Sequence, residues 1–302
     1  MNKQELSAMV AEILNSMGAE PMVKGSDYKP ENPGPQQADT HYHDGDFVED
    51  VTKLDLRKLY LTENPEQGEK YRALKAKTPA RLGSGRAGPR YKTLTMLRFR
   101  ADHAAAQDAV FSQVPEDYAQ KNNLLALQTL CHDKDEYLTR PDRGRLFDEE
   151  NQAKLKKEFP NAPKVLIVIG DGLSSAAISA NAMDCMAAIR DGLKAKGIET
   201  GKAVFVRYCR VGAGDAIGSA TGCELVCMLV GERPGLVTDK SMSAYITYQP
   251  RIGVSESSRT VVSNIHAQGT PAVEAGAHIA VLIDTILKRK VSGVGLHQEA
   301  DL

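Results

Sequence analysis

The chain has 302 residues and a net charge of −1, and 42% of its residues are hydrophobic and 25% charged. This length and composition predict a folded globular protein with one large or two small domains. The balanced charge excludes a general nucleic-acid binder, and no apolar run approaches the 18 or so residues that span a bilayer, so we expect no contact with nucleic acid or membrane.

The N-terminal 50 residues predict a short helix followed by a linker. Residues 18–50 are rich in Gly, Pro, Asp and Gln, which is typical of a flexible linker. A short tethered helix cannot bury an apolar stripe alone, so we expect it to bind another surface or, alternatively, to pack on its own domain. The stripe predicted within residues 2–17 consists of Leu6, Val10, Ile13, Leu14 and Met17.

Residues 51–160 predict a mainly helical region. Its apolar periodicity and its prolines place three helices, and a glycine- and proline-rich loop at 79–89 interrupts them. The helices are expected over 93–111, from Pro115 onward and over 145–159.

Charge is distributed unevenly along the first hundred residues. Residues 51–100 hold 13 Lys or Arg against four acidic residues, whereas residues 1–50 hold three Lys against ten Asp or Glu. The basic block suits an anionic ligand or an acidic partner, and the alternative is a solvated helix face. In and directly after the glycine- and proline-rich loop, Arg81, Arg86 and Arg90 could direct guanidinium groups at carboxylates or phosphates, or simply face solvent.

The last part of the chain alternates between strands and helices, which indicates a mostly parallel sheet. The predicted fold class is α/β, with a C-terminal doubly wound, mostly parallel sheet, helices on both faces, and a mainly helical region before it. We therefore divide the chain into regions 1–50, 51–160 and 161–302. Strands are predicted at 164–169, 203–208 and 224–230, and helices at 174–196 and 271–290.

The stretch from Lys164 to Ser175, KVLIVIGDGLSS, is the clearest strand, turn and helix signal in the chain. A buried strand that leads through a glycine turn into a helix N-terminus forms the place where open α/β sheets usually hold a ligand. The sequence therefore predicts a ligand crevice at the turn, Gly170 to Gly172. Gly83 to Gly88 also matches GxGxxG, but no buried strand precedes it and a proline follows, so we reject a dinucleotide site there.

The cysteines and histidines give no strong metal signal. The five cysteines form no CxxC pair and no cleavable signal peptide is recognisable, which predicts reduced thiols in the cytoplasm. His41 and His43 are candidate loose metal ligands, but ordering a linker around a metal is entropically costly. No nucleophile–base pair, zinc site or carboxylate dyad is recognisable, so no catalytic or metal-ligating residue is predicted.

The segment Asn264-Ile-His266-Ala-Gln-Gly269 is similar to the DxHxxG motif, whose histidine ligates cobalt in base-off cobalamin proteins. In that motif Asp orients the imidazole and raises its basicity, and Asn does this poorly. In those proteins the motif also stands at the start of its domain, after the first strand, and here it does not. We therefore do not expect His266 to ligate cobalt.

Several long motifs in the same order resemble the small subunit of ethanolamine ammonia-lyase. The resemblance covers roughly residues 50–295, and the first 50 residues match only in character. The motifs are GSGRAGPR (83–90), YLTRPDRGR (137–145), IGDGLSS (169–175), VRYCRV (206–211), VGERPGL (230–236) and SNIHAQGTPAVEA (263–275).

The resemblance implies one subunit of an adenosylcobalamin-dependent lyase that converts ethanolamine to acetaldehyde and ammonia by a radical mechanism. In this family a large TIM-barrel subunit holds the substrate, and the small subunit helps to enclose the cofactor at the interface. Cobalamin keeps its own dimethylbenzimidazole as the lower ligand. Residues 51–160 would then face the large subunit, and reversing the charge of Arg86 is expected to weaken assembly.

The resemblance also implies three cofactor contacts. Val211 closes VRYCRV just after a predicted strand, where backbone or apolar groups can meet the corrinoid. Glu232 follows the strand 224–230, where its carboxylate can accept from amide or hydroxyl donors. Val261 occupies a position where the family often has Cys, which suggests contact through backbone or packing. The alternatives are core packing for the two valines and a capping or salt-bridge role for Glu232.

The N-terminal helix fits the same setting. Short amphipathic helices on linkers resemble the encapsulation peptides of enzymes that reside inside bacterial microcompartments. We therefore expect residues 2–17 to bind shell or cargo, and the protein to reside in the bacterial cytoplasm inside a microcompartment.

Two other functions stay open at this point. One is a non-catalytic corrinoid-binding or assembly protein that loads cofactor onto a partner. It differs from an enzyme subunit in stoichiometry, because a subunit copurifies with the large chain at equal ratio. The other is a nucleotide-binding α/β protein, which is disfavoured because the second predicted strand ends in Arg207-Tyr208 and lacks the acidic residue that binds ribose.

Overall fold

The computed structural model describes residues 50–55 and 57–298. The helix predicted over 2–17 and nearly all of the linker predicted over 18–50 lie outside these residues. Among the residues described, no helix is both long enough and apolar enough to cross a membrane.

The long helix α3 (Thr93–Phe111) has the bounds that the sequence predicts. Near its start, Arg98 fastens the preceding segment, because its Nη1 donates to the backbone oxygens of Val51, Thr52 and Leu54 at 2.7 to 3.0 Å. Its Nε donates to Asp102 Oδ1 at 2.9 Å one helical turn later. The short elements before α3 are η1 (Val51–Lys53), α2 (Gly68–Lys75), β1 (Arg86–Ala87) and β2 (Arg90–Tyr91).

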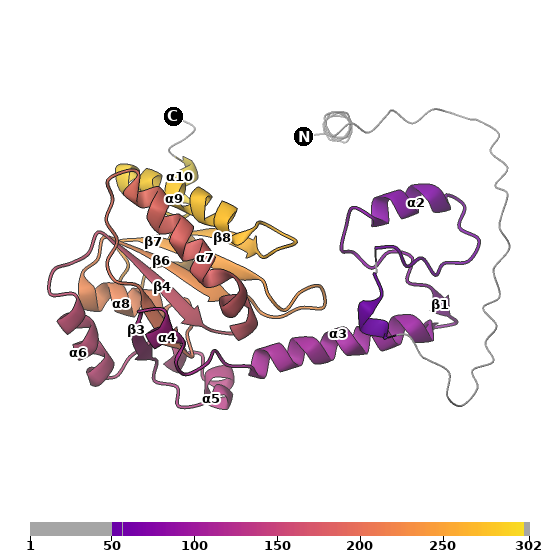
Figure 1. The fold of residues 1–302 in the computed structure, drawn as a ribbon, viewed down its shortest axis with the longest axis horizontal. Coiled ribbons are helices and arrows are strands. Elements are labelled where there is room, and N and C mark those ends of the chain that lie inside the picture. The colour runs from indigo at the N-terminus through magenta and orange to yellow at the C-terminus, as the bar shows by residue number, and fades with distance from the viewer. Residues whose placement is uncertain (1–49, 56, 299–302) are drawn as a thin grey trace. The chain divides into compact units, whose positions relative to one another are not determined.

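A six-stranded sheet forms the centre of the α/β region (Figure 1). The strand order is β3-β5-β4-β6-β7-β8, in which the first four strands are parallel and the β6–β7 and β7–β8 pairs are antiparallel. The carboxyl ends of β6 and β8 and the start of β7 therefore lie side by side at one end of the strands. The bounds are β3 (Leu125–Gln128), β4 (Val165–Asp171), β5 (Val204–Arg207), β6 (Leu225–Gly231), β7 (Met242–Tyr248) and β8 (Arg259–Ile265).

Helices cover both faces of this sheet, as predicted. On one face of the sheet lie α7 (Ser175–Lys194) and α9 (Ala272–Arg289) (Figure 1). They pack over side chains such as Ile167 and Leu229. On the other face α6 (Glu149–Glu158) and α8 (Ala213–Thr221) enclose a second core. The remaining elements are α4 (Tyr118–Lys121), α5 (Lys134–Thr139), η2 (Arg143–Arg145), η3 (Glu256–Ser258) and α10 (Gly295–Gln298).

The fold class is α/β with a mostly parallel sheet, which confirms the prediction, but three strands were not expected from the sequence. β3 falls in the region predicted to be mainly helical and forms one edge of the sheet. β7 and β8 follow the predicted strands and run antiparallel to their neighbours. The helix predicted over 145–159 begins at Glu149, because the Asp148 carboxylate caps it by accepting from the Asn151 N–H at 2.8 Å.

Candidate functional site

The glycine turn after β4 is filled by the protein itself. A Cβ at Gly170 would lie 2.8 Å from the Cys209 sulfur, so the glycine allows close packing there. Asp171 is buried and accepts from the Val114 N–H at 3.2 Å and from the Ser175 hydroxyl at 2.5 Å. Lys134 Nζ donates to the Gly172 oxygen at 2.9 Å. The prediction of a ligand crevice at this turn is therefore wrong, because the chain's own side chains fill the space.

A polar cluster lies instead where β6 ends. Glu232 directly follows β6, and its N–H donates to the Ser241 oxygen at 2.9 Å. Its Oε1 accepts from the Ser243 hydroxyl at 2.6 Å and from the Asn264 N–H at 3.0 Å. Three neighbouring strand ends thus fix one carboxylate. The two serines, Ser241 and Ser243, were not predicted. Their alternation in KSMSAY, which places them on one face of a strand, was the available signal.

A β-bulge on β8 brings Asn264 onto this carboxylate. Met242 pairs with Ile265 and Ala244 with Val262, so β8 carries one extra residue across this interval. Asn264 lies there with a φ of 62°, a left-handed conformation that Asn tolerates better than most residues. Its side-chain oxygen accepts from His266 Nε2 at 2.7 Å, while His266 Nδ1 accepts from the Gln268 N–H at 3.3 Å. His266 therefore orients Asn264.

Glu232 is held in its ionised form. Its partial burial opposes ionisation, but the hydrogen bonds from Ser243 and the Asn264 N–H, with the nearby Ser241 hydroxyl and the His266 ring, lower its pKa below the ordinary value. Among the residues described, none donates to the second carboxylate oxygen, Oε2. The cluster therefore presents a fixed, charged acceptor at the edge of the sheet.

The three residues that the resemblance implied lie on one face of the sheet. Val230 pairs with Ser243, and Tyr245 pairs with Val261, so these side chains and that of Glu232 share the face that α8 covers. Val211 packs on the same core, immediately before α8. Val261 is 46% exposed, so its side chain is available for contact.

Val261 and Glu232 do not touch each other. Val261 lies opposite Tyr245, four residues along β7 from Ser241, which corresponds to about 13 Å along the strand. A single ligand that contacts both must therefore be broad. The two side chains lie on the same face of the sheet.

A buried ion pair joins the two elements that border this face. Arg259 on β8 donates from Nη1 and Nη2 to the two oxygens of Asp215 on α8, at 2.8 and 2.7 Å. Only 3% of the Arg259 side chain is exposed, and its Nε also donates to Glu256 at 2.7 Å. These residues are 44 positions apart in the chain, and no sequence pattern signalled the pair.

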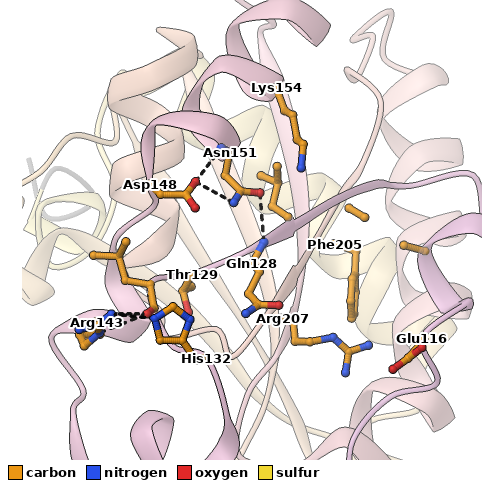
Figure 2. A pocket seen from close by; sticks show the side chains of 14 residues that line it. Glu116, Gln128, Thr129, His132, Arg143, Asp148, Asn151, Lys154, Phe205 and Arg207 are labelled. Carbon is orange, nitrogen blue, oxygen red and sulfur yellow. Dashed lines mark hydrogen bonds between the residues drawn. The ribbon is translucent and has the colours of Figure 1, made fainter.

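A separate pocket of about 450 Å³ lies beside β5 and the edge strand β3, which is the edge strand farthest from β8 (Figure 2). Asn151 bridges part of it, accepting from the Gln128 N–H at 3.4 Å and donating to Asp148 at 2.8 Å. Two of its cations are already paired, Arg143 with Glu136 and Lys154 with Glu150. None of the three implied contact residues lines this pocket.

The arginine loop forms another hollow, of about 500 Å³, around Gly83 to Arg86. Arg81 is mostly buried and pairs with Asp102 at 2.7 Å, which makes it a structural residue. Arg86 is exposed, lies over the Tyr91 ring at 4.8 Å and donates to the Pro89 oxygen at 3.1 Å. Arg90 is exposed as well, so of the three predicted arginines Arg86 and Arg90 are available at the surface.

The cysteines and metal candidates take no part in the site. All five cysteines are buried and unpaired, and burial raises their pKa values, most strongly at Cys209 and Cys227. Among the described residues, no group of three or more His, Cys, Asp or Glu side chains is arranged to hold a metal ion. His41 and His43 lie outside those residues.

Fold and site together define an α/β protein that presents a fixed carboxylate and apolar side chains on one face of its sheet. Comparison with known proteins identifies its family. The family model described as ethanolamine ammonia-lyase light chain (EutC) matches residues 68–297. The chain is 55% identical over 298 residues to the ethanolamine ammonia-lyase small subunit of Clostridioides difficile, covering 98% of this chain and all of the relative.

Other relatives agree. The proteins of the same name from Clostridium perfringens and Listeria innocua are 52% and 50% identical over 296 residues, which is 98% of this chain and all of each relative. The chain therefore belongs to the ethanolamine ammonia-lyase light chain family, and the resemblance found in the sequence motifs is confirmed.

Proposed function

We propose that this chain helps to bind adenosylcobalamin in an ethanolamine ammonia-lyase, on the face of the sheet that holds Val211, Glu232 and Val261. The observation that supports this most is the Glu232 carboxylate, which three strand ends fix and whose Oε2 accepts from no described residue. The relatives are named as the small subunit of this enzyme, so a large subunit is the expected partner.

The residues fit such a cofactor. A corrinoid has an apolar macrocycle edged with primary amides. Glu232 offers an ionised acceptor for amide N–H groups, and the exposed Val261 and the partly buried Val211 offer apolar surface. The distance of about 13 Å along β7 between the Val261 and Glu232 positions suits a ligand of this breadth.

When bound, adenosylcobalamin supplies the one-electron chemistry by which ethanolamine becomes acetaldehyde and ammonia. The residues of this chain bind and orient. Glu232 accepts hydrogen bonds, the valines exclude water from the contact, and the Asp215–Arg259 pair keeps α8 and β8 at a fixed spacing. The contacts with the substrate are proposed to lie on the large subunit, as the resemblance implies.

The basic block 51–100 is proposed to face the large subunit. Arg86 is exposed, whereas Arg81 is engaged with Asp102 inside the chain, so Arg86 is the better probe of the interface. Acidic side chains on the partner would match the excess of 13 basic over four acidic residues.

Residues 2–17 are proposed to direct the enzyme into a microcompartment in the bacterial cytoplasm by binding shell or cargo. The support is their predicted amphipathic stripe followed by a linker. In a microcompartment-forming host, deleting 2–17 should leave the enzyme in the soluble cytoplasmic fraction. Full encapsulation of the deletion variant would contradict the proposal.

A reconstitution assay tests the main proposal. The full chain is mixed with its cognate large subunit, adenosylcobalamin and ethanolamine, and acetaldehyde is followed with a coupled dehydrogenase. Turnover that requires both chains and the cofactor is expected. If no turnover occurs but this chain alone binds cobalamin, a corrinoid carrier replaces the enzyme subunit as the better account.

A further inference from the structure

The loop between β6 and β7, residues 232–241, is fastened unevenly to the rest of the chain. Its second half is held by α7 and by the residue directly before it. The Ser174 hydroxyl donates to the Asp239 backbone oxygen at 2.5 Å. The Asn181 side-chain amide donates to the Lys240 backbone oxygen at 2.8 Å. The first half of the loop, which begins at the proposed cofactor contact, has no such support from α7.

One side chain from the N-terminal part of the chain holds that first half. Arg81 Nη2 donates to the Leu236 backbone oxygen at 2.7 Å, although the two residues are 155 positions apart. Within the described part of the chain, no other hydrogen bond joins residues 233–237 to a group outside the loop. Arg81 therefore fixes where the segment that follows Glu232 lies.

The Arg81 guanidinium is itself held in place. Its Nη2 also donates to Asp102 Oδ2 at 2.7 Å, and its carbon lies 4.5 Å from the centre of the Phe99 ring. Only 16% of the Arg81 side chain is exposed. Nη2 carries two hydrogens, so it can serve both acceptors at once. Because the ion pair and the ring already orient this planar group, its hydrogen bond to the loop loses little further side-chain entropy.

Arg81 also connects the loop to the region that is proposed to face the large subunit. The Phe99 ring beneath Arg81 meets the Tyr91 ring edge-on, with the ring centres 5.3 Å apart. Arg86 lies over the other ring of this pair, 4.8 Å from its centre. A continuous series of contacts therefore runs from Arg86 through two aromatic rings to Arg81 and on to the loop. Packed series of this kind can carry coupling between two surfaces, and mutation measures that coupling.

We propose that Arg81 is a positioning residue for the cofactor contact: it holds Leu236 and so fixes the loop that begins at Glu232. The inference rests on the proposed function, and it gives Arg81 a role beyond its ion pair with Asp102. Arg81 acts through the loop and does not touch the cofactor. It thereby links large-subunit binding to cofactor binding, and by thermodynamic linkage each should strengthen the other by the same factor.

The first test measures amide hydrogen exchange in the full chain without cofactor or partner. Arg81→Ala should speed exchange in peptides covering 232–240 by about two- to tenfold, the range for loss of one hydrogen bond. Arg98→Ala is the matched control. Arg98 also pairs with Asp102 and its side chain is equally buried, but it holds the segment before α3 and not the loop. Equal loop exchange in wild type and Arg81→Ala would overturn the proposal.

A second variant separates positioning from stability. Arg81→Lys keeps a positive charge beside Asp102, but an ammonium group on a lysine stem cannot reproduce the planar fork that reaches Leu236 as well. The urea midpoint of Arg81→Lys should therefore stay near that of wild type, while its loop should exchange as fast as that of Arg81→Ala. A lysine variant that protects the loop like wild type would contradict the assigned hydrogen bond.

The third test measures cobalamin binding in the complex, at large-subunit concentrations that saturate assembly. Both Arg81 variants should raise the dissociation constant of adenosylcobalamin by about two- to tenfold. Their kcat at saturating cofactor should be unchanged, because Arg81 meets no reacting group. Arg98→Ala should bind like wild type. If it weakens binding as much as Arg81→Ala, the effect belongs to packing around Asp102, and the positioning role is wrong.

The proposed function and the positioning role fail differently. If the wild-type complex binds no adenosylcobalamin, the proposed function is wrong, and the exchange test still decides whether Arg81 holds the loop. If wild type binds the cofactor and the loop of Arg81→Ala exchanges faster at unchanged affinity, the function stands and the positioning role is wrong. In a Glu232→Gln background the effect of Arg81→Ala on affinity should shrink, because Arg81 acts through that carboxylate.

Discussion

Replacing Asp215 with Ala should destabilise the protein more than replacing Asp215 and Arg259 together. The two side chains are 9% and 3% exposed, and they form a two-point contact at 2.8 and 2.7 Å between α8 and β8. Without Asp215, the Arg259 guanidinium stays buried and loses its main counter-ion. A buried charge left alone costs far more than a buried pair that is replaced as a whole.

The structure sets the size of the effect. Breaking a buried pair from one side costs about 3–5 kcal/mol. Glu256 still accepts from Arg259 at 2.7 Å, but its own side chain is 70% exposed, so it compensates only weakly. We therefore expect Asp215→Ala to lower the free energy of unfolding by about 3 kcal/mol. Adding Arg259→Met removes the charge and keeps a long apolar side chain, so the double variant should lose only about 1 kcal/mol.

Urea unfolding followed by circular dichroism at pH 7 measures both variants, with the free energy taken from the midpoint at unchanged slope. Cobalamin affinity should fall with stability in Asp215→Ala, because α8 and β8 border the proposed contact face. Two results would refute the reasoning. One is a loss below about 1 kcal/mol for Asp215→Ala, the value of an exposed pair. The other is a double variant as unstable as the single one.

Three further predictions concern other parts of the chain. Hydrogen bonds outweigh burial and hold the pKa of Glu232 below its ordinary 4.5. The proposed contribution of its carboxylate to cobalamin binding should therefore be present above pH 4.5 and be lost as the pH falls through the lowered pKa. Glu232→Gln should raise the dissociation constant of adenosylcobalamin about tenfold at pH 7. It should also remove the loss of affinity at acid pH, and equilibrium binding measures both effects. Arg86→Glu should weaken assembly with the large subunit in analytical ultracentrifugation, whereas Lys156→Glu on the exposed side of α6 should not; equal assembly of both would remove Arg86 from the interface. Gly170→Ala should lower the free energy of unfolding by about 1–3 kcal/mol, because the new Cβ would lie 2.8 Å from the Cys209 sulfur, and an unchanged urea midpoint would contradict this packing.

The elements predicted correctly are those whose signal is local. β4 is a run of buried apolar residues, and α3 combines length with a helical pattern, so each was visible without knowledge of its neighbours. β3 has only four residues and becomes a strand because it pairs with β5. β8 is an edge strand with polar, exposed positions, and its identity depends on β7. Pairing across the sheet is a tertiary property that periodicity does not report.

The position of the candidate site in the fold was predictable in outline, but the residues that hold Glu232 in place were not. The position of Glu232 after a buried strand indicated an acceptor at the edge of the sheet, and the structure places it there. The groups that fix it come from β7 and from a bulge in β8, and neither strand was predicted. The glycine turn after β4 misled for a related reason. Glycines there mark close backbone approach, and the approaching atoms turned out to be protein, not ligand.

His266 shows how a motif residue can act through its neighbours. Its Nδ1 accepts from Gln268 and its Nε2 donates to Asn264, so both ring nitrogens serve the loop after β8. The Asn264 side chain is thereby fixed while its N–H holds Glu232. The neutral side-chain oxygen of Asn264 accepts a hydrogen bond from the ring N–H, and the positive φ of 62° at the bulge is one that Asn tolerates. The similarity to a cobalt-binding motif therefore marks, in this chain, a hydrogen-bonded support that runs from His266 through Asn264 to the carboxylate of Glu232.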